Sequence, residues 1–278
     1  MLVAALGFAI MGALVKVGAT KFSSAELVFY RSIFGLMAIY AFIYARKLPL
    51  KTPVLAKQMS RALVGFISLV LFFYAIAHLP LATAITLNYT SALFLAALLP
   101  IVLHEKPRKM AYLCILLGFV GVVLLLKPNL NKQDILAGII GLSSGFGAAI
   151  AYINVKQLAQ LNEPDWRTVF YFTLVSTIAS GAWLLLQPFT PIRWHDLPAL
   201  IGLGVAATIA QLAMTRAYRT GKTLTVASLA YLTVVFASGF GMLFWQEHLS
   251  PSEWLAISLI ILSGIISIKT TNQTATTK

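Results

Sequence analysis

Six polar side chains lie inside long apolar runs of the sequence, where a polar group needs a partner. They are Arg31, Asn88, Tyr89, Asn154, Gln211 and Tyr231. An arginine in apolar surroundings is costly and usually faces a cavity or a partner, so Arg31 could bind a carboxylate or a phosphate. Tyrosine combines ring area with a hydroxyl, which suits a site that grips a planar molecule. These residue types indicate ligand binding through charge, hydrogen bonds and ring contacts.

Each of these residues also has a structural interpretation. Arg31 lies about six residues into its apolar run, roughly 9 Å from the end, and could extend to the surface or pair with Glu26. Residues 88–91 are consecutive polar residues, so on a helix they cannot all face one cavity. Small hydroxyls often serve helix packing, whereas an asparagine is harder to bury, so Asn88 is the stronger candidate for a pocket.

Three charged residues at the ends of apolar runs are candidates for gating contacts. Glu105 and Glu247 end two similar runs, and Lys16 lies near the end of the first run. The alternative for Glu105 is a structural pairing with Lys106 or Arg108. Lys16 could simply extend its amine to the surface.

The composition places these residues in a membrane. The chain has 278 residues, of which 59% are apolar and 10% charged, and its mean hydropathy is +0.87. Soluble domains carry about 25% charged residues. The net charge of +13 comes from basic residues between the apolar runs, which favours a lipid bilayer over nucleic acid as the partner. The single cysteine, Cys114, excludes a disulfide framework and a cysteine metal site.

Ten apolar runs approach the roughly 20 residues that a membrane-spanning helix needs. They fall near residues 2–19, 25–45, 60–78, 81–103, 110–127, 134–155, 167–187, 197–217, 224–245 and 252–269. With a cytoplasmic N-terminus, 15 of the 21 Lys and Arg residues fall in inner segments and 5 in outer ones, and Arg31 lies within a span. This bias predicts a multi-pass protein of the plasma (inner) membrane with both termini cytoplasmic. We expect a monomer or homodimer.

Residues 85–105 and 227–247 contain one pattern twice, 142 positions apart. Leu87, Tyr89, Phe94 and Glu105 recur as Leu229, Tyr231, Phe236 and Glu247. The offset aligns the first five spans with the last five and predicts two domains, residues 1–130 and 131–278. Because five is odd, the second copy is inverted in the membrane, as in many secondary transporters. We predict an all-α integral membrane protein with ten transmembrane helices in two inverted five-helix repeats around a central cavity.

Sequence patterns for hydrolysis, metal binding, ATP binding and proton transfer are weak or absent. The segment "GLSSG" (141–145) matches a hydrolase nucleophile pattern, but it lies in an apolar helix, where small residues four apart favour helix packing. The four histidines lie at the ends of runs or in loops, which predicts no metal site, and no ATP-binding loop is present. No carboxylate lies in the middle of a predicted span, where it could bind and release a proton during proton-coupled transport. We therefore expect neither an enzyme nor a cofactor.

With these marks the sequence resembles the drug/metabolite transporter superfamily, specifically proteins with two tandem EamA-type domains. The marks are "GFAIMGALVK" (7–16), "ELVFYRSIFGLMA" (26–38), the terminal Glu of the fourth and ninth spans, "GFVGVVLLLKP" (118–128) and "ILSGIISIK" (261–269). The resemblance implies a ten-helix bundle with a central cavity that moves amino acids, nucleotide-like metabolites, vitamins, sugar phosphates or drugs. The counterpart of the second span, residues 166–181, has no interior arginine, so Arg31 is not half of a pair.

These observations predict a secondary transporter of small polar metabolites, such as an amino acid, a vitamin or a nucleotide-like compound. It would work by alternating access, with export favoured over uptake. Two alternatives stay open. One is an intramembrane enzyme that acts on a lipid-linked substrate. The other is an uptake permease for riboflavin or S-adenosylmethionine, since the layout also resembles proteins proposed to carry them.

Overall fold

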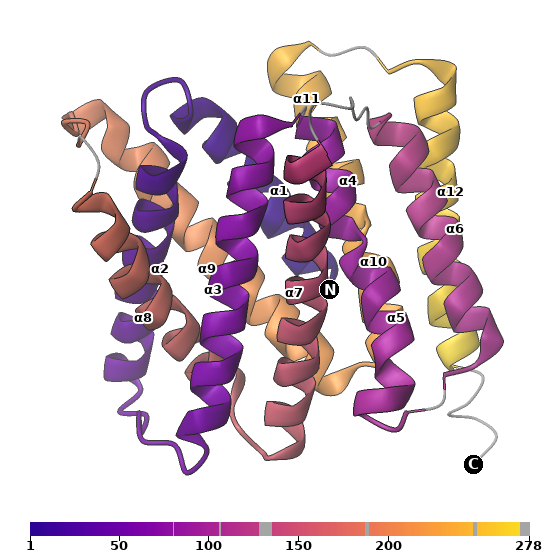
Figure 1. Cartoon of the computed structure of the whole chain (residues 1–278), viewed down its shortest axis with the longest axis horizontal. Coiled ribbons are helices and arrows are strands. Elements are labelled where there is room, and N and C mark those ends of the chain that lie inside the picture. The colour runs from indigo at the N-terminus through magenta and orange to yellow at the C-terminus, as the bar shows by residue number, and fades with distance from the viewer. Residues whose placement is uncertain (80, 106, 128–134, 187–188, 247–248, 273–278) are drawn as a thin grey trace.

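The computed structural model describes residues 1–79, 81–105, 107–127, 135–186, 189–246 and 249–272, and the regular structure within these ranges is helical. The elements are α1 (Leu2–Gly18), α2 (Ser24–Ala45), α3 (Leu55–His78), α4 (Leu81–Tyr89), α5 (Ser91–Val102), α6 (Lys109–Leu126), α7 (Ile135–Gln160), α8 (Asp165–Leu184), η2 (Trp194–Asp196), α9 (Leu197–Thr220), α10 (Thr223–Ala230), α11 (Leu232–Trp245) and α12 (Pro251–Asn272). They pack side by side in one bundle, with α2 and α8 at one side and α6 and α12 at the other (Figure 1).

Eight helical stretches in the described ranges are long and apolar enough to cross a membrane. They are Ser24–Ala45, Leu55–Ala75, Ala84–Val102, Lys109–Leu126, Ile135–Gln160, Trp194–Thr220, Thr223–Phe244 and Pro251–Lys269. Helix α1 is a shorter apolar helix, and α8 falls outside both groups and buries several hydroxyl side chains. The protein is therefore a multi-pass membrane protein. The count of ten spans stays a prediction that depends on α1 and α8.

Helix α3 begins earlier than the apolar run indicated. It starts at Leu55, two residues after Pro53, whereas the run starts near residue 60. Arg61, the second residue of the predicted run, therefore lies well inside the helix rather than at its start. It is 3% exposed. This is the largest difference between the predicted and observed helix starts, and it changes the candidate site.

Two of the predicted spans are interrupted by a tightened turn. Between α4 and α5, the N–H of Thr90 donates to the carbonyl of Leu87 at 3.2 Å, three residues back. Between α10 and α11, the N–H of Tyr231 donates to the carbonyl of Ser228 at 3.4 Å. The Thr90 hydroxyl also donates to the Leu87 carbonyl at 2.5 Å, which competes with the regular helical hydrogen bond. The two interruptions occupy nearly the same place in the two copies of the sequence pattern.

The interruption between α4 and α5 packs against the backbone of α7. A Cβ atom on Gly145 would lie 2.7 Å from the Leu87 carbonyl oxygen and 2.5 Å from the Thr90 hydroxyl oxygen. A Cβ atom on Gly141, one turn earlier, would lie 2.9 Å from a methyl group of Leu87. The small residues of "GLSSG" thus let two helices touch, which is the packing interpretation of that segment.

The largest interfaces each join a helix of residues 1–127 to a helix of residues 135–272. Helices α1–α6 can be matched in order to α7–α12. The interface of α3 with α7 then corresponds to that of α9 with α1, and the interface of α2 with α9 corresponds to that of α8 with α3. Helix α5 packs on α7 as α11 packs on α1, while α2 packs on α8 and α6 on α12. If each label is advanced by six, with α1 following α12, the first three pairs of interfaces exchange and the interfaces of α2 with α8 and of α6 with α12 map onto themselves. The core of the bundle is therefore shared between the two halves.

Candidate functional site

Arg31 projects from α2 into the interior of the bundle. The residue is 8% exposed, its Nε donates to the Met11 sulfur at 3.3 Å, and its guanidinium carbon lies 5.8 Å from the centroid of the Phe172 ring. A small cavity opens beside it between α2, α8 and α9. The cavity is lined by Arg31, Ser32, Phe172, Thr173, Ala207, Thr208 and Gln211. Two of the predicted binding residues, Arg31 and Gln211, therefore meet at one cavity.

A close crossing of α2 and α9 positions this cavity. A Cβ atom on Gly204 would lie 2.9 Å from the backbone nitrogen of Gly35, and one on Gly35 would lie 2.7 Å from the Thr208 hydroxyl oxygen. Neither helix could approach this closely with a larger residue at the crossing. Because Gly35 is one turn after Arg31, the crossing holds the guanidinium against α9.

Arg61 is a further interior arginine, which the sequence analysis did not select as a site residue. Its guanidinium carbon lies 4.6 Å from the centroid of the same Phe172 ring that Arg31 contacts. The absence of a side chain on Gly65 makes room for it, because a Cβ atom there would overlap the Arg61 Nη1. With a predicted start near residue 60, Arg61 was expected at the end of its span, whereas a start just after Pro53 would have placed it inside the helix.

Neither arginine has a carboxylate partner among the residues that the structure describes, since none of the ion pairs there involves Arg31 or Arg61. Glu26, the expected alternative partner of Arg31, instead completes a capping box with Ser23 and accepts from the Thr190 N–H at 2.6 Å. The remaining described carboxylates also bond elsewhere. They are Glu105, Glu163, Asp165, Asp196 and Glu253.

Several donors around the arginines lack hydrogen-bond partners within the described ranges. They are Nε and Nη1 of Arg61, the Ser32 hydroxyl and Nε2 of Gln211. Leaving a buried donor unsatisfied costs about 1–3 kcal/mol, and more for a charged group. Ser32 and Gln211 line the cavity beside Arg31. The region is therefore rich in positive charge and donors and suits a ligand that supplies anionic acceptors.

The predicted tyrosines lie in a second region, packed ring against ring. The Tyr89 and Tyr231 ring centroids are 5.9 Å apart, and Tyr231 also lies 6.5 Å from Phe119. Tyr152 and Tyr218 stack at 4.9 Å in the same core cluster. Tyr231 is fully buried, and its hydroxyl is one of the unpartnered groups in the described part of the chain. These rings fill their space rather than line the cavity beside Arg31.

The two predicted asparagines connect α7 to its neighbours. Asn88 donates to the Ser144 hydroxyl at 3.1 Å, and Asn154 donates to the Ser60 hydroxyl at 3.4 Å. Neither lines the cavity beside Arg31. Both amides therefore contribute to helix packing, and their contact with a substrate stays a prediction.

The predicted gating residues lie apart from one another. Glu105 is half-buried and accepts from the Thr223 hydroxyl at 3.3 Å, which joins the end of α5 to the start of α10. Lys156 of α7 donates to the Gly221 carbonyl at 3.0 Å in the turn just before α10. Lys16 is exposed on α1. Glu247 lies outside the described residues.

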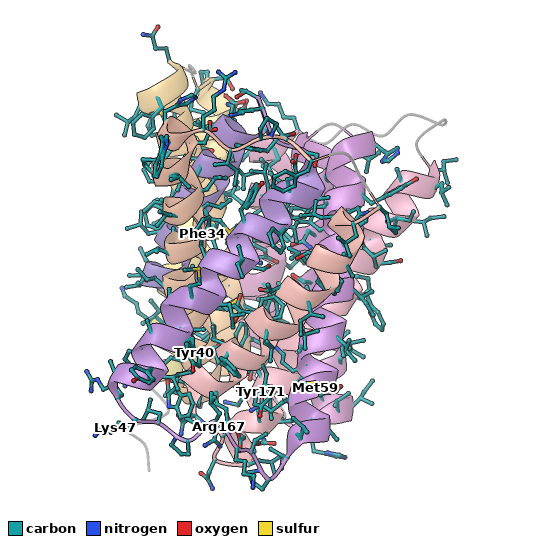
Figure 2. All side chains as sticks on the ribbon, turned by 90° about the vertical axis from the view of Figure 1, so that its left-hand side faces the viewer. Phe34, Tyr40, Lys47, Met59, Arg167 and Tyr171 are labelled. Atoms are coloured by element: carbon teal, nitrogen blue, oxygen red, sulfur yellow. The ribbon has the colours of Figure 1, made fainter. Side chains whose placement is uncertain are left out.

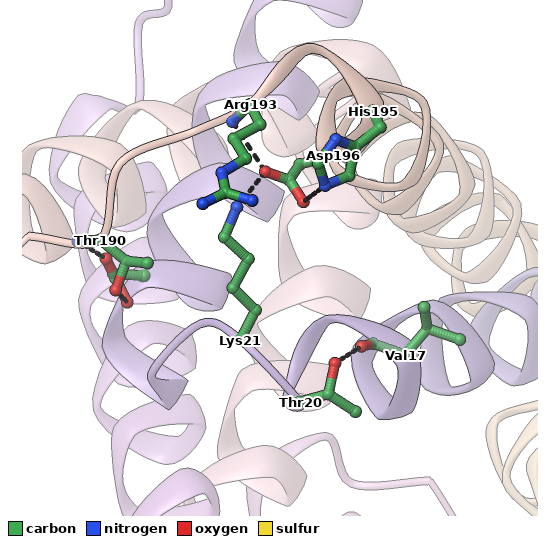
Figure 3. Close-up of polar contacts among 8 residues, drawn as sticks. Val17, Thr20, Lys21, Thr190, Arg193, His195 and Asp196 are labelled. Carbon is green, nitrogen blue, oxygen red and sulfur yellow. Dashed lines mark hydrogen bonds and ion pairs between the residues drawn. The ribbon is translucent and has the colours of Figure 1, made fainter.

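Polar contacts connect helices at both ends of the bundle. At the end where α2 meets α3, Arg167 donates to the Pro49 carbonyl at 2.9 Å and Tyr171 to the Leu50 carbonyl at 3.0 Å (Figure 2). At the opposite end, Asp196 pairs with Lys21 and accepts from the Arg193 N–H at 2.7 Å (Figure 3). Such contacts would have to exchange if either end opened.

Comparison with known proteins gives this architecture a context. Residues 1–127 and 135–269 each match the EamA-like transporter family. The chain is 29% identical over 270 residues to the pseudopaline exporter CntI of Pseudomonas aeruginosa strain UCBPP-PA14, covering 97% of this chain and 94% of the relative. It is 26% identical to a riboflavin transporter of Vibrio cholerae, covering 95% and 89% of the two chains.

A solved structure titled "Crystal structure of protein" superposes with a TM-score of 0.85 at 17% identity, over 97% of this chain and 98% of that one. This likeness extends over nearly the whole bundle and supports the helical fold. The two family matches confirm the resemblance that the sequence motifs indicated. Together they show that the chain belongs to the EamA-like transporter family, with two tandem domains of that type.

Proposed function

We propose that this transporter exports small polar metabolites that carry an anionic group, by alternating access between two inverted halves. The observation that carries the proposal is the pair of buried arginines, Arg31 at the cavity and Arg61 on the same Phe172 ring, with no carboxylate partner among the described residues. A buried charge in a membrane protein is costly unless it is matched, and a substrate anion would match it during transport. In this proposal the protein binds and releases its substrate without catalysis.

The matched helix interfaces support the inverted repeat and its division into residues 1–130 and 131–278. Exchanging the two halves converts the interface of α3 with α7 into that of α9 with α1, as a two-fold relation between halves would require. The helix interruptions near Thr90 and Tyr231 lie in equivalent places in the two copies. Interrupted helices at corresponding places in two repeats commonly mark the binding region of secondary transporters. Ten spans around a central pathway fit both observations.

Export is supported by the relative named as a pseudopaline exporter, which matches almost the full length of the chain. The excess of Lys and Arg in alternate loops supports a plasma (inner) membrane location with both termini in the cytoplasm. Uptake is the alternative direction, and the riboflavin transporter among the relatives keeps vitamins among the candidate substrates. A monomer or homodimer is consistent with a site that lies within one chain.

Transport by reconstituted vesicles tests the proposal. Purified protein in proteoliposomes would be loaded with labelled amino acids, carboxylic acids, vitamins or nucleotides, and exchange would be measured in both directions. We expect exchange of anionic compounds and little exchange of neutral or cationic ones of similar size. Exchange confined to neutral or cationic compounds would refute the anionic class, and turnover of a lipid-linked substrate without exchange would refute the transporter.

A further inference from the structure

We propose that Arg31 and Arg61 form a single two-cation site around Phe172 that selects substrates with two separated carboxylates. This deepens the proposed function, on which it rests, because it names the class of anion. From the sequence, Arg31 alone was a candidate for anion binding. Arg61 enters only through its position in the structure.

The two guanidinium groups share one aromatic ring. Their carbons lie 5.8 Å and 4.6 Å from the Phe172 centroid, so they cannot be farther apart than the sum of those two distances. Arg31 lies about 10 Å from the start of α2, and Arg61 about 9 Å from the start of α3. These consecutive helices start at opposite ends of the bundle (Figure 1). The backbone positions of the two arginines are therefore offset toward opposite ends.

Two guanidinium groups that reach one ring from oppositely directed helices favour an anion with two groups over a compact one. A single carboxylate or phosphate beside Arg31 would leave the Arg61 charge unmatched across the Phe172 ring. Interactions between charges are strong in a low-dielectric interior, so a ligand with two negative charges gains more from the two cations than a ligand with one. A molecule with two carboxylates separated by a short carbon chain could reach both guanidinium groups, while its chain lies against the ring.

The donors near the arginines support binding rather than a structural role. Arg61 has two nitrogen atoms without partners in the described ranges, and so has the Gln211 amide that lines the cavity. A structural arginine would be expected to use its donors on carbonyl groups or carboxylates of the protein, since buried polar groups are normally hydrogen-bonded. Here the guanidinium of Arg61 instead lies between the ring of Phe172 and the backbone at Gly65.

Gly65 provides a variant that perturbs the site and keeps both charges. A Cβ atom there would overlap Nη1 of Arg61 and lie 3.1 Å from a ring atom of Phe172. Because Nη1 is at the end of a flexible side chain, Gly65→Ala should displace the guanidinium without removing it. If the position of Arg61 matters for binding, Gly65→Ala and Arg61→Gln should weaken the same ligands.

Thermal unfolding of the purified full chain in detergent tests the proposal. A ligand that binds the folded state raises Tm, so the shift in Tm reports binding. The probes are succinate, glutarate and adipate. Each is compared with its mono-amide at equal concentration and ionic strength. For the wild type, we expect at least one dicarboxylate to raise Tm by more than its mono-amide does. The difference should vanish in Arg61→Gln and Gly65→Ala. It should persist in Arg216→Gln, which changes an exposed arginine of α9.

Three results would overturn the two-cation site. They are equal stabilisation by mono-amide and dicarboxylate, stabilisation by none of the dicarboxylates, and persistence of the difference in both Arg61→Gln and Gly65→Ala. If Arg61→Gln does not fold, the same comparison of dicarboxylate and mono-amide is made with Arg61→Lys and Gly65→Ala. A dicarboxylate that binds the protein but is not exchanged across the vesicle membrane would refute the transport function, while the two-cation site would stand. Exchange of a monoanion at equal rates by the wild type and Gly65→Ala would refute the two-cation site, while the transport function would stand.

Discussion

The region of the two arginines and the region of the tyrosines are both buried, but they differ in what their polar groups contact. Two guanidinium groups lie against Phe172 without a carboxylate partner in the described ranges, and one of them, that of Arg31, lines a cavity. Around Tyr231, aromatic rings fill the space, and a Cβ atom on Gly118 would lie 2.6 Å from the Tyr231 ring. The first region is charged, whereas the second is uncharged and tightly packed.

This difference separates two roles that the sequence analysis had assigned to one site. A buried charge without a partner calls for a ligand of opposite charge, whereas packed rings need none. The tyrosine region contains the interruption between α10 and α11, and α7 packs on the corresponding interruption between α4 and α5. We therefore expect the arginine region to control binding, and the interrupted helices to control movement between conformations.

The largest effect is expected at Arg31. Replacing Arg31 with Gln removes a charged donor of the cavity, and a hydrogen bond to a charged group contributes about 1.5–3 kcal/mol. Affinity for an anionic substrate should therefore fall by roughly 10- to 100-fold, as measured by titration calorimetry. Arg46→Gln, at the exposed end of the same helix, is the control and should bind normally. Normal binding by Arg31→Gln would remove this residue from the site.

The next effect concerns the helix contact at Gly145. Gly145→Ala places a methyl group against the Leu87 carbonyl and the Thr90 hydroxyl, and such overpacking costs about 1–3 kcal/mol. The variant should unfold at a lower temperature and transport more slowly. Its control is Gly12→Ala, where a Cβ atom meets nothing within 4 Å and helix propensity favours alanine by up to about 1 kcal/mol. Equal behaviour of the two variants would show that α7 does not pack closely on the interruption.

A smaller effect is expected at Tyr231. Tyr231→Phe removes a buried hydroxyl that has no partner in the described ranges and keeps the ring contacts with Tyr89 and Phe119. Removing an unsatisfied polar group is close to neutral or stabilising, so Tm should stay the same or rise slightly. A clear fall in Tm, seen in thermal unfolding, would mean that the hydroxyl has a partner that this conformation lacks.

The smallest effect is expected at Glu105. Glu105→Gln keeps the size of a half-buried side chain that accepts a 3.3 Å hydrogen bond from Thr223. The free energy of unfolding should fall by less than about 1 kcal/mol, because an amide oxygen can still accept from the hydroxyl. Chemical denaturation would measure this change. A gating role would appear instead as altered exchange rates with unchanged unfolding.

The sequence predicted the helices well because the bilayer sets their length and apolar character. It did not reveal Arg61 as an interior residue, because the apolar run begins only one residue before it, whereas α3 extends further back through residues that include Lys57 and Gln58. It did not reveal Phe172 either, because one apolar residue among many has no distinguishing pattern. The helix interruptions involve a single tightened turn each, which leaves no signal in the apolar pattern. Contacts between distant segments had to come from the structure.

The most direct measurement compares the two regions through one ligand. The dissociation constant of the dicarboxylate that stabilises the wild type best would be determined for Arg61→Gln and for Tyr231→Phe. We predict a rise of about ten-fold or more for Arg61→Gln, which corresponds to about 1.4 kcal/mol, and little change for Tyr231→Phe. A ten-fold rise for Tyr231→Phe with unchanged affinity for Arg61→Gln would contradict the account and place the substrate among the tyrosines.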